Sequence, residues 1–291
     1  MLKLFLGDGM KMKYSLLIIV LLLTSCTGND VQEVSYENDE EMTKLTIDKN
    51  QNDFNNDETG KRQLLTLMAN SADYYHYLSG SMIVTQTYQG NSIQYKYQFQ
   101  INLDNYHSYI YQIASNSLKE QFYFRDQEKM YFYYGNLKQL ETETLSKLQE
   151  ENLLVIEKVP RDDILYQNSD QSLEQRIADL NSTRVPHDLF GDVAPYVFPE
   201  EIALYQLGLN YNNYHLSNTS FLEKETFLVE GSINQEYYNP GSISMIVDKQ
   251  TGILLKYQYT ADISSVEMVM EELLIDQAAD EDYYLKYIKK I

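Results

Sequence analysis

The chain has 291 residues, and its 43 acidic side chains outnumber 23 basic ones, which gives a formal net charge of −20. A surface of this charge repels the phosphates of nucleic acids and the headgroups of anionic lipids, so nucleic acid is excluded as a partner. Cys26 is the one cysteine, so no disulfide can form within the chain and the apolar core must hold the fold.

The first predicted element is a secretory signal over residues 1–25. Lys11 and Lys13 precede an apolar stretch, residues 16–23, which is shorter than the about 20 residues of a permanent membrane span. The run Leu-Thr-Ser-Cys at 23–26 resembles the lipobox of bacterial lipoproteins, in which the thiol receives a diacylglyceryl group and becomes the N-terminus. This resemblance implies an extracytoplasmic protein anchored to the cell membrane through Cys26. The alternative is an ordinary signal peptide with an incidental cysteine. Three methionines are compatible with the start of translation: Met1, Met10 and Met12.

A disordered tether is expected over residues 26–58. After Cys26 this segment carries ten acids against two lysines, and its large apolar residues are sparse and without period. Such a composition cannot bury enough apolar surface to order itself. Residues 59–291 are then predicted to form one β-rich binding domain.

The domain is predicted to open with a helix over residues 60–79, because apolar residues recur at helical spacing until Gly80. The period then changes to two, and apolar residues at 93, 95, 97, 99 and 101 alternate with polar ones, as in a half-buried antiparallel strand. The 27 tyrosines also favour pleated structure. The other strands predicted in this half are 81–88, 106–114, 121–125 and 130–134.

A helical insertion is expected near residues 137–199, followed by a second β series. The insertion begins with a predicted helix over 137–152 and contains four of the five prolines. Residues 200–207 are predicted to be helical, and 249–252 to form a hairpin turn. The second series of strands is predicted at 214–222, 225–237, 242–248, 254–259 and 266–276, with a closing helix at 282–291.

Aromatic residues at alternate positions of these strands are the candidate binding site. The hypothesis is an aromatic-lined concavity for an apolar ligand or a peptide. The alternative is cross-strand packing over a helix. The candidate residues are Tyr95, Tyr97, Phe99, Tyr109, Tyr111, Tyr131 and Tyr133.

No catalytic or cofactor motif is found. The sequence has no His-Glu-x-x-His, no Gly-x-Ser-x-Gly, no P-loop and no dinucleotide-binding glycine pattern. We therefore expect no enzyme, no metal and no cofactor. The four histidines are scattered, and an enzyme would need His107 or His215 to meet a carboxylate in a deep pocket.

Three segments carry a family resemblance: Met-Tyr-Phe-Tyr-Tyr at 130–134, Val-Phe-Pro-Glu at 197–200, and the hairpin at 246–256 with its Asp-x-x-Thr-Gly. With the order of elements, residues 59–276 resemble the superfamily of LolA/LolB lipoprotein carriers, LppX-type lipid-binding lipoproteins and RseB-type regulators. The resemblance implies a strongly curved, unclosed antiparallel sheet around helices. The chain departs from the carriers in lacking tryptophan and in its insertion. A shuttling carrier is soluble, so an anchored chain is expected to be a binder or sensor.

The predicted fold class is therefore α+β, a strongly curved, mostly antiparallel sheet packed around an N-terminal amphipathic helix. The predicted function is that of a membrane-anchored lipoprotein that binds a hydrophobic ligand, a peptide or an envelope protein in the sheet concavity. The alternative is a regulatory or immunity-type interaction lipoprotein without a small ligand, whose own side chains fill the concavity.

Overall fold

The computed structural model describes residues 53–104, 107–114, 117–125, 129–136, 139–140, 143–158, 171–178, 184, 190–233 and 239–277. The predicted signal peptide, Cys26, the tether up to residue 52 and the predicted closing helix 282–291 lie outside these residues.

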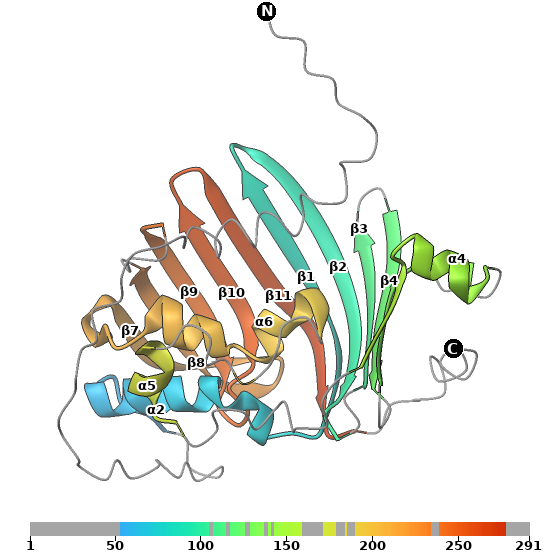
Figure 1. The fold of residues 1–291 in the computed structure, drawn as a ribbon. Coiled ribbons are helices and arrows are strands. Elements are labelled where there is room, and N and C mark those ends of the chain that lie inside the picture. Colours follow the sequence, from blue (N-terminus) through green and yellow to red (C-terminus); the bar gives the residue numbers. More distant parts are fainter. Residues whose placement is uncertain are drawn as a thin grey trace, which may run out of the picture.

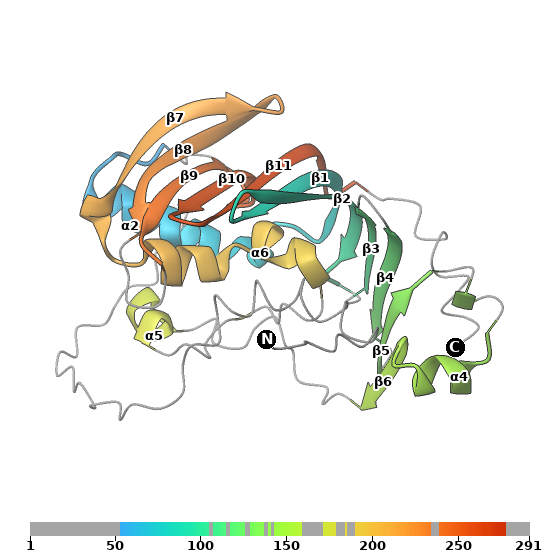
Figure 2. The ribbon, with the colours of Figure 1, turned by 90° about the horizontal axis from the view of Figure 1, so that it is seen from above.

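The described strands form one antiparallel sheet of eleven strands in the order β6-β5-β4-β3-β2-β1-β11-β10-β9-β8-β7. Two meanders, β1–β6 and β7–β11, meet where β1 pairs with β11. The sheet bends into an arc that does not close, as Figure 2 shows, so that β6 and β7 are its two edges. The predicted curved, unclosed antiparallel sheet is confirmed. Its strands are β1 Tyr77–Tyr88, β2 Asn91–Asn102, β3 His107–Ala114, β4 Ser117–Arg125, β5 Lys129–Gly135, β6 Leu154–Lys158, β7 Tyr214–Phe221, β8 Lys224–Ile233, β9 Gly241–Asp248, β10 Leu254–Ala261 and β11 Ser264–Ile275.

Helices lie on both sides of the arc. The helices α2, α5 and α6 lie inside it, and α4 lies outside, beyond β5 and β6 (Figures 1 and 2). The predicted helix at 200–207 is present as a π-helix, η5. The helical segments are α2 Glu58–Ala69, η1 Ser71–Asp73, α4 Leu145–Glu150, α5 Leu173–Ala178, η4 Gly191–Val193, α6 Ala194–Val197, η5 Ile202–Leu207 and η6 Tyr211–Asn213.

The leading helix is shorter than predicted. It starts where the Asp57 carboxylate accepts from the Gly60 amide at 2.8 Å, and it ends at Ala69 instead of residue 79. Gly80, interpreted as a helix stop, lies within β1. A Cβ on Gly80 would come 2.3 Å from the backbone oxygen of Glu272, so the glycine lets β1 approach β11 closely.

Ordered structure also begins earlier than the predicted boundary at residue 59. Residues 53–58, the last six of the segment predicted as a tether, contact the domain. The Phe54 ring stacks on Phe227 at 5.0 Å between centroids, and the Asn56 side chain accepts from the Leu216 amide at 2.7 Å. Phe54 is 8% exposed and belongs to the main core.

Strand β6 lies in the segment predicted as a helical insertion. Its first three residues, 154–156, are apolar without alternation and are followed by Glu157 and Lys158, and so short an apolar run does not separate a strand from a buried helix. Of the predicted helix at 137–152, the described residues 139–140 and α4 are helical, and residues 143–144 between them are not.

The predicted turn at 249–252 is confirmed and packs on α2. Both the amide and the hydroxyl of Thr251 donate to the Asp248 carboxylate, at 3.1 and 2.6 Å. Gly252 has φ +76°, and a Cβ there would lie 2.6 Å from the backbone oxygen of Leu67. The Asp-x-x-Thr-Gly pattern thus has a structural role: it closes the hairpin and lets it fit against the helix.

Candidate functional site

The strand register places the candidate aromatic residues on two opposite faces of the sheet. Residues paired across neighbouring antiparallel strands share a face. Tyr97 pairs with Gln112, so that both face the inside of the arc, whereas Tyr111 pairs with Gln98 on the outside. The same register puts Tyr95, Tyr97 and Phe99 on the concave face.

Tyr109, Tyr131 and Tyr133 lie with Tyr111 on the convex face. Tyr109 pairs with position 122, and position 122 pairs with Tyr133, so the two tyrosines share a face. Tyr133 is fully buried, as is Leu148 of α4, but neither belongs to the main core. The predicted single aromatic lining is therefore divided: three residues face the concavity and four face outward, on the α4 side of the sheet.

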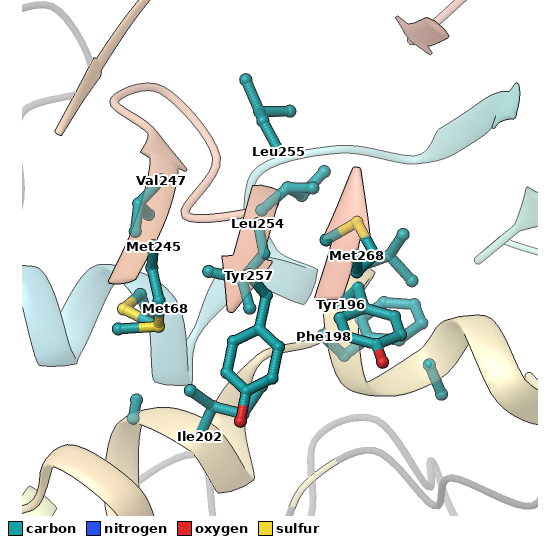
Figure 3. Packing of buried hydrophobic residues seen from close by; sticks show 14 of the residues in the cluster. Met68, Tyr196, Phe198, Ile202, Met245, Val247, Leu254, Leu255, Tyr257 and Met268 are labelled. Carbon is teal, nitrogen blue, oxygen red and sulfur yellow. The ribbon is translucent and has the colours of Figure 1, made fainter. Parts of the chain in front are cut away.

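The concave face is filled by helices of the chain itself. Figure 3 shows Met68 of α2 beside Met245 and Ile202 of η5 beside Tyr257, and the Tyr196 ring lies 6.0 Å from that of Tyr257. Side chains from α2, η4, α6 with its C-cap residue, and η5 complete the core with exposures of 0–4%: Leu64, Leu67, Met68, Val193, Val197, Phe198, Ile202, Ala203 and Leu204.

A small cavity with both polar and apolar lining remains where η4 meets strands β1 to β3. The hydroxyl of Tyr97 donates to the Asp192 carboxylate at 3.0 Å, and the Gln112 amide donates to the Tyr97 hydroxyl at 2.8 Å. The cavity measures about 20 Å³, which is room for a single water molecule. It is lined by Val84, Gln86, Tyr95, Tyr97, Gln112, Asp192 and Tyr196.

Two tyrosines of this cavity, Tyr97 and Tyr196, stay neutral. Burial, reinforced by the nearby Asp192 carboxylate, raises the pKa of Tyr97 far above its usual value. The same two causes raise the pKa of Tyr196. The Tyr97 hydroxyl therefore acts as a hydrogen-bond donor and does not ionise to act as a nucleophile or base.

A buried ionic cluster fixes the inner helices. Arg176 of α5 contacts the Glu200 carboxylate and donates to the backbone oxygen of Ala69 at 2.8 Å. Arg184 donates from its amide to Glu200 at 2.8 Å and from its guanidinium to Asp73 at 2.7 and 2.9 Å. Glu200 thus joins two arginines from the insertion beside the end of α2. The sequence pattern did not indicate this cluster, because its members are far apart along the chain.

The other chemistry-bearing residues form no centre in the described part of the chain. No group of three or more His, Asp or Glu there could hold a metal ion. The ring of His215 contacts the Asn56 side chain at 2.7 Å, on the exposed edge strand β7, and His107 is buried on β3. Among the described helices, none is both long and apolar enough to cross a bilayer.

The fold and its interior define the class of protein: an open, curved antiparallel sheet wrapped around helices that occupy its concave face. No protein-family model matches the chain, and no curated protein does. Among solved structures it is similar to MucB, with 11% identity, a TM-score of 0.37 and coverage of 77% of this chain and 62% of MucB. It is also similar to LprF from Mycobacterium bovis, with 9% identity, a TM-score of 0.31 and coverage of 76% and 98%.

A LolA superfamily protein from Nitrosomonas europaea is a third similar structure, with 8% identity, a TM-score of 0.28 and coverage of 75% and 96%. A LolA-superfamily member is thus among the matches, and the fold that the sequence resemblance implies is the fold described above. The chain spans about 62% of the length of MucB. The likeness is one of fold alone.

Proposed function

We propose that this protein is a lipid-anchored, extracytoplasmic interaction protein that meets a partner protein on its outer surfaces and carries no small ligand in its concavity. The filled concave face supports this proposal most directly. Sites for drug-sized ligands are about 300–1,000 Å³, and the cavity beside Asp192 measures about 20 Å³. An acyl chain would have to displace α6 and η5 from the sheet.

The anchor is the second part of the proposal. It rests on the lipobox-like run that ends at Cys26, on the positive and apolar segments before it, and on the acidic tether after it. Two acyl chains hold a protein on a bilayer stably where one is marginal. An anchor is required because the acidic surface has no attraction for anionic lipids.

Labelling of cells with radioactive palmitate tests the anchor. The expected result is label on the wild-type chain, in the membrane fraction, and none on Cys26→Ser. Label that persists in Cys26→Ser, or an unlabelled wild-type chain, would contradict the anchor. The same preparations, extracted and examined by mass spectrometry, report whether any further lipid is bound without a covalent link.

A further inference from the structure

Three of the five large apolar side chains that are exposed in the described residues gather at one end of the sheet. Tyr88 is 48% exposed, Ile93 48% and Ile263 50%. Tyr88 and Ile93 belong to the hairpin β1–β2, and Ile263 belongs to the turn between β10 and β11. The other two, Leu209 and Leu274, lie elsewhere in the fold.

The two hairpin tips are joined to each other. Tyr88 pairs with Ser264 at the start of β11, and the Gln89 amide donates to the backbone oxygen of Ile263 at 2.8 Å. Ile93 lies diagonally across from Tyr88 on the same face, because it pairs with Gln86. We call Tyr88, Ile93 and Ile263, with these two turns, the apolar tip. Figure 1 shows both hairpins extending away from α2, α5 and α6.

The apolar tip is almost free of charge in a strongly acidic chain. No Asp, Glu, Lys or Arg occurs between Asp73 and Lys96, and Asp262 is the one such residue between Lys256 and Glu267. The whole chain carries 66 of these side chains (43 acidic and 23 basic). A surface that selects a charged partner by complementarity would carry charges of its own. A protruding, apolar surface with Asp262 as its one charged side chain instead fits an apolar phase.

A second copy of the chain is a poor occupant. The three half-exposed side chains offer on the order of 300 Å², whereas a stable interface buries about 800 Å² on each partner. The net charge of −20 on each copy adds repulsion. A bilayer needs no such area, because the lipid anchor supplies the attachment.

The described chain begins at the end of the sheet that lies opposite the apolar tip. Asp53 binds Lys249, which follows the end of β9 away from the tip, at 2.7 Å. The 26 residues of 27–52 can span at most about 85–94 Å when fully extended, whereas the twelve residues of β1 span about 40 Å. The segment between Cys26 and the domain is therefore long enough for the tip to reach the membrane that holds the anchor.

We propose that the apolar tip is a membrane-docking surface that inserts into the headgroup region of the bilayer holding the anchor, and so fixes the orientation of the domain. This inference rests on the anchor proposed above. Tyr88 suits the site, because a tyrosine at a membrane interface buries its ring and keeps its hydroxyl in water.

The absence of tryptophan from the chain allows a direct test. Ile263→Trp places the one indole at the tip. Leu274→Trp, also in an exposed position, places it about 35 Å away along the same strand. The purified full-length, lipidated protein is reconstituted into phosphatidylcholine vesicles with brominated acyl chains, which quench indole fluorescence on contact.

The expected result is at least threefold stronger quenching in Ile263→Trp than in Leu274→Trp. Adding Tyr88→Ser and Ile93→Ser to Ile263→Trp should remove most of that difference. Because Tyr88, Ile93 and Ile263 are uncharged and the tip has no basic side chain to pair with a lipid phosphate, 0.5 M salt should leave the quenching unchanged within about 20%.

One outcome would overturn the docking and leave the anchor intact: the N-terminal peptide carries the lipid and the protein floats with the vesicles, but the indole at the tip is not quenched. Equal quenching at both positions would also overturn it, as would tip-dependent self-association in place of quenching. A chain that carries no lipid and does not float would overturn the anchor and the docking together.

Discussion

The Arg176 guanidinium and the Glu200 carboxylate form an ion pair inside the protein, with 2% and 3% of the two side chains exposed. The other carboxylate oxygen of Glu200 accepts the backbone amide of Arg184. Because Glu200 lies two residues before the start of η5, this pair connects helix α5 of the insertion to the helices that fill the concave face. The packing of the concavity therefore depends on a charge buried at its edge.

Glu200→Gln is expected to destabilise the fold by about 3–5 kcal/mol, because it leaves the Arg176 guanidinium buried beside a neutral side chain, whereas the Arg184 guanidinium keeps its pair with Asp73. Urea unfolding measures the change. Glu174→Gln is the matched control on the same insertion: its pair with Arg62 has side chains that are 29% and 38% exposed, and loss of such a pair costs less than about 1 kcal/mol. Equal losses in the two variants would show that the buried pair has no special role.

Phe54→Ala is expected to cost about 3 kcal/mol, although the residue lies in the segment whose composition predicts a tether. The ring is buried against Phe227, and its removal leaves a cavity. Asp53→Ala, one position earlier, removes an 83% exposed side chain and should cost less than about 0.5 kcal/mol. If thermal unfolding is the same in both variants, the contact with Phe227 is unimportant and order begins after it.

The predicted aromatic site is divided between two faces of the sheet, and Tyr97→Phe is expected to have a larger effect on stability than Tyr111→Phe. Tyr97→Phe removes the hydroxyl that donates to Asp192, so we expect a loss of about 1–2 kcal/mol. Tyr111→Phe, on the convex face and only partly buried, should change stability by less than about 0.5 kcal/mol. The reverse order of effects would contradict the assignment of the two residues to the two faces.

Two carboxylates are expected to make opposite contributions to the pH dependence of stability. The hydrogen bond with Arg62 lowers the pKa of Glu174, so its contribution is present above the usual pKa of 4.5 and is lost as the pH falls. Burial raises the pKa of Asp248. The contribution of this carboxyl group to the free energy of unfolding is therefore most favourable below its usual pKa of 3.8, and it is lost as the pH rises through the pKa of the folded state.

The free energy of unfolding at pH 7 and pH 4 measures both contributions. As the pH falls from 7 to 4, the amount by which the free energy of unfolding of the wild type exceeds that of Glu174→Gln should shrink. Over the same fall, the free energy of unfolding of the wild type should rise relative to that of Asp248→Asn. Shifts of the same sign in both comparisons would contradict the assigned causes.

The sequence predicted that side chains alternate between two faces along each strand. It did not predict which set of side chains in each strand lies on the concave face. Buried Tyr95, Tyr97 and Phe99 follow from alternation alone. The face of Tyr111 depends on the connection: Asn102 pairs with His107, so the four residues between them make odd positions of β2 share a face with even positions of β3. The even number of residues in this connection is a signal in the sequence that predicts the division.

The end of α2 and the buried ionic cluster had no such signal. Apolar residues at helical spacing continue through Tyr75 and Leu78. Leu78 nevertheless belongs to β1, because it pairs with Ile275, which lies almost 200 residues later in the chain. The contacts of Glu200 with Arg176 and Arg184 likewise depend on the folded insertion. Local pattern fixes neither feature, because both arise from tertiary packing.

Native mass spectrometry of a chain beginning at residue 27, which has no anchor and contains every described residue, tests the central claim that the concavity is filled by the protein itself. The account predicts the mass of the polypeptide alone, even after incubation with excess phospholipid and free fatty acid. A stoichiometric adduct of lipid or another hydrophobic ligand that survives gentle ionisation would contradict it, and would show that α6 and η5 leave the sheet to admit a ligand.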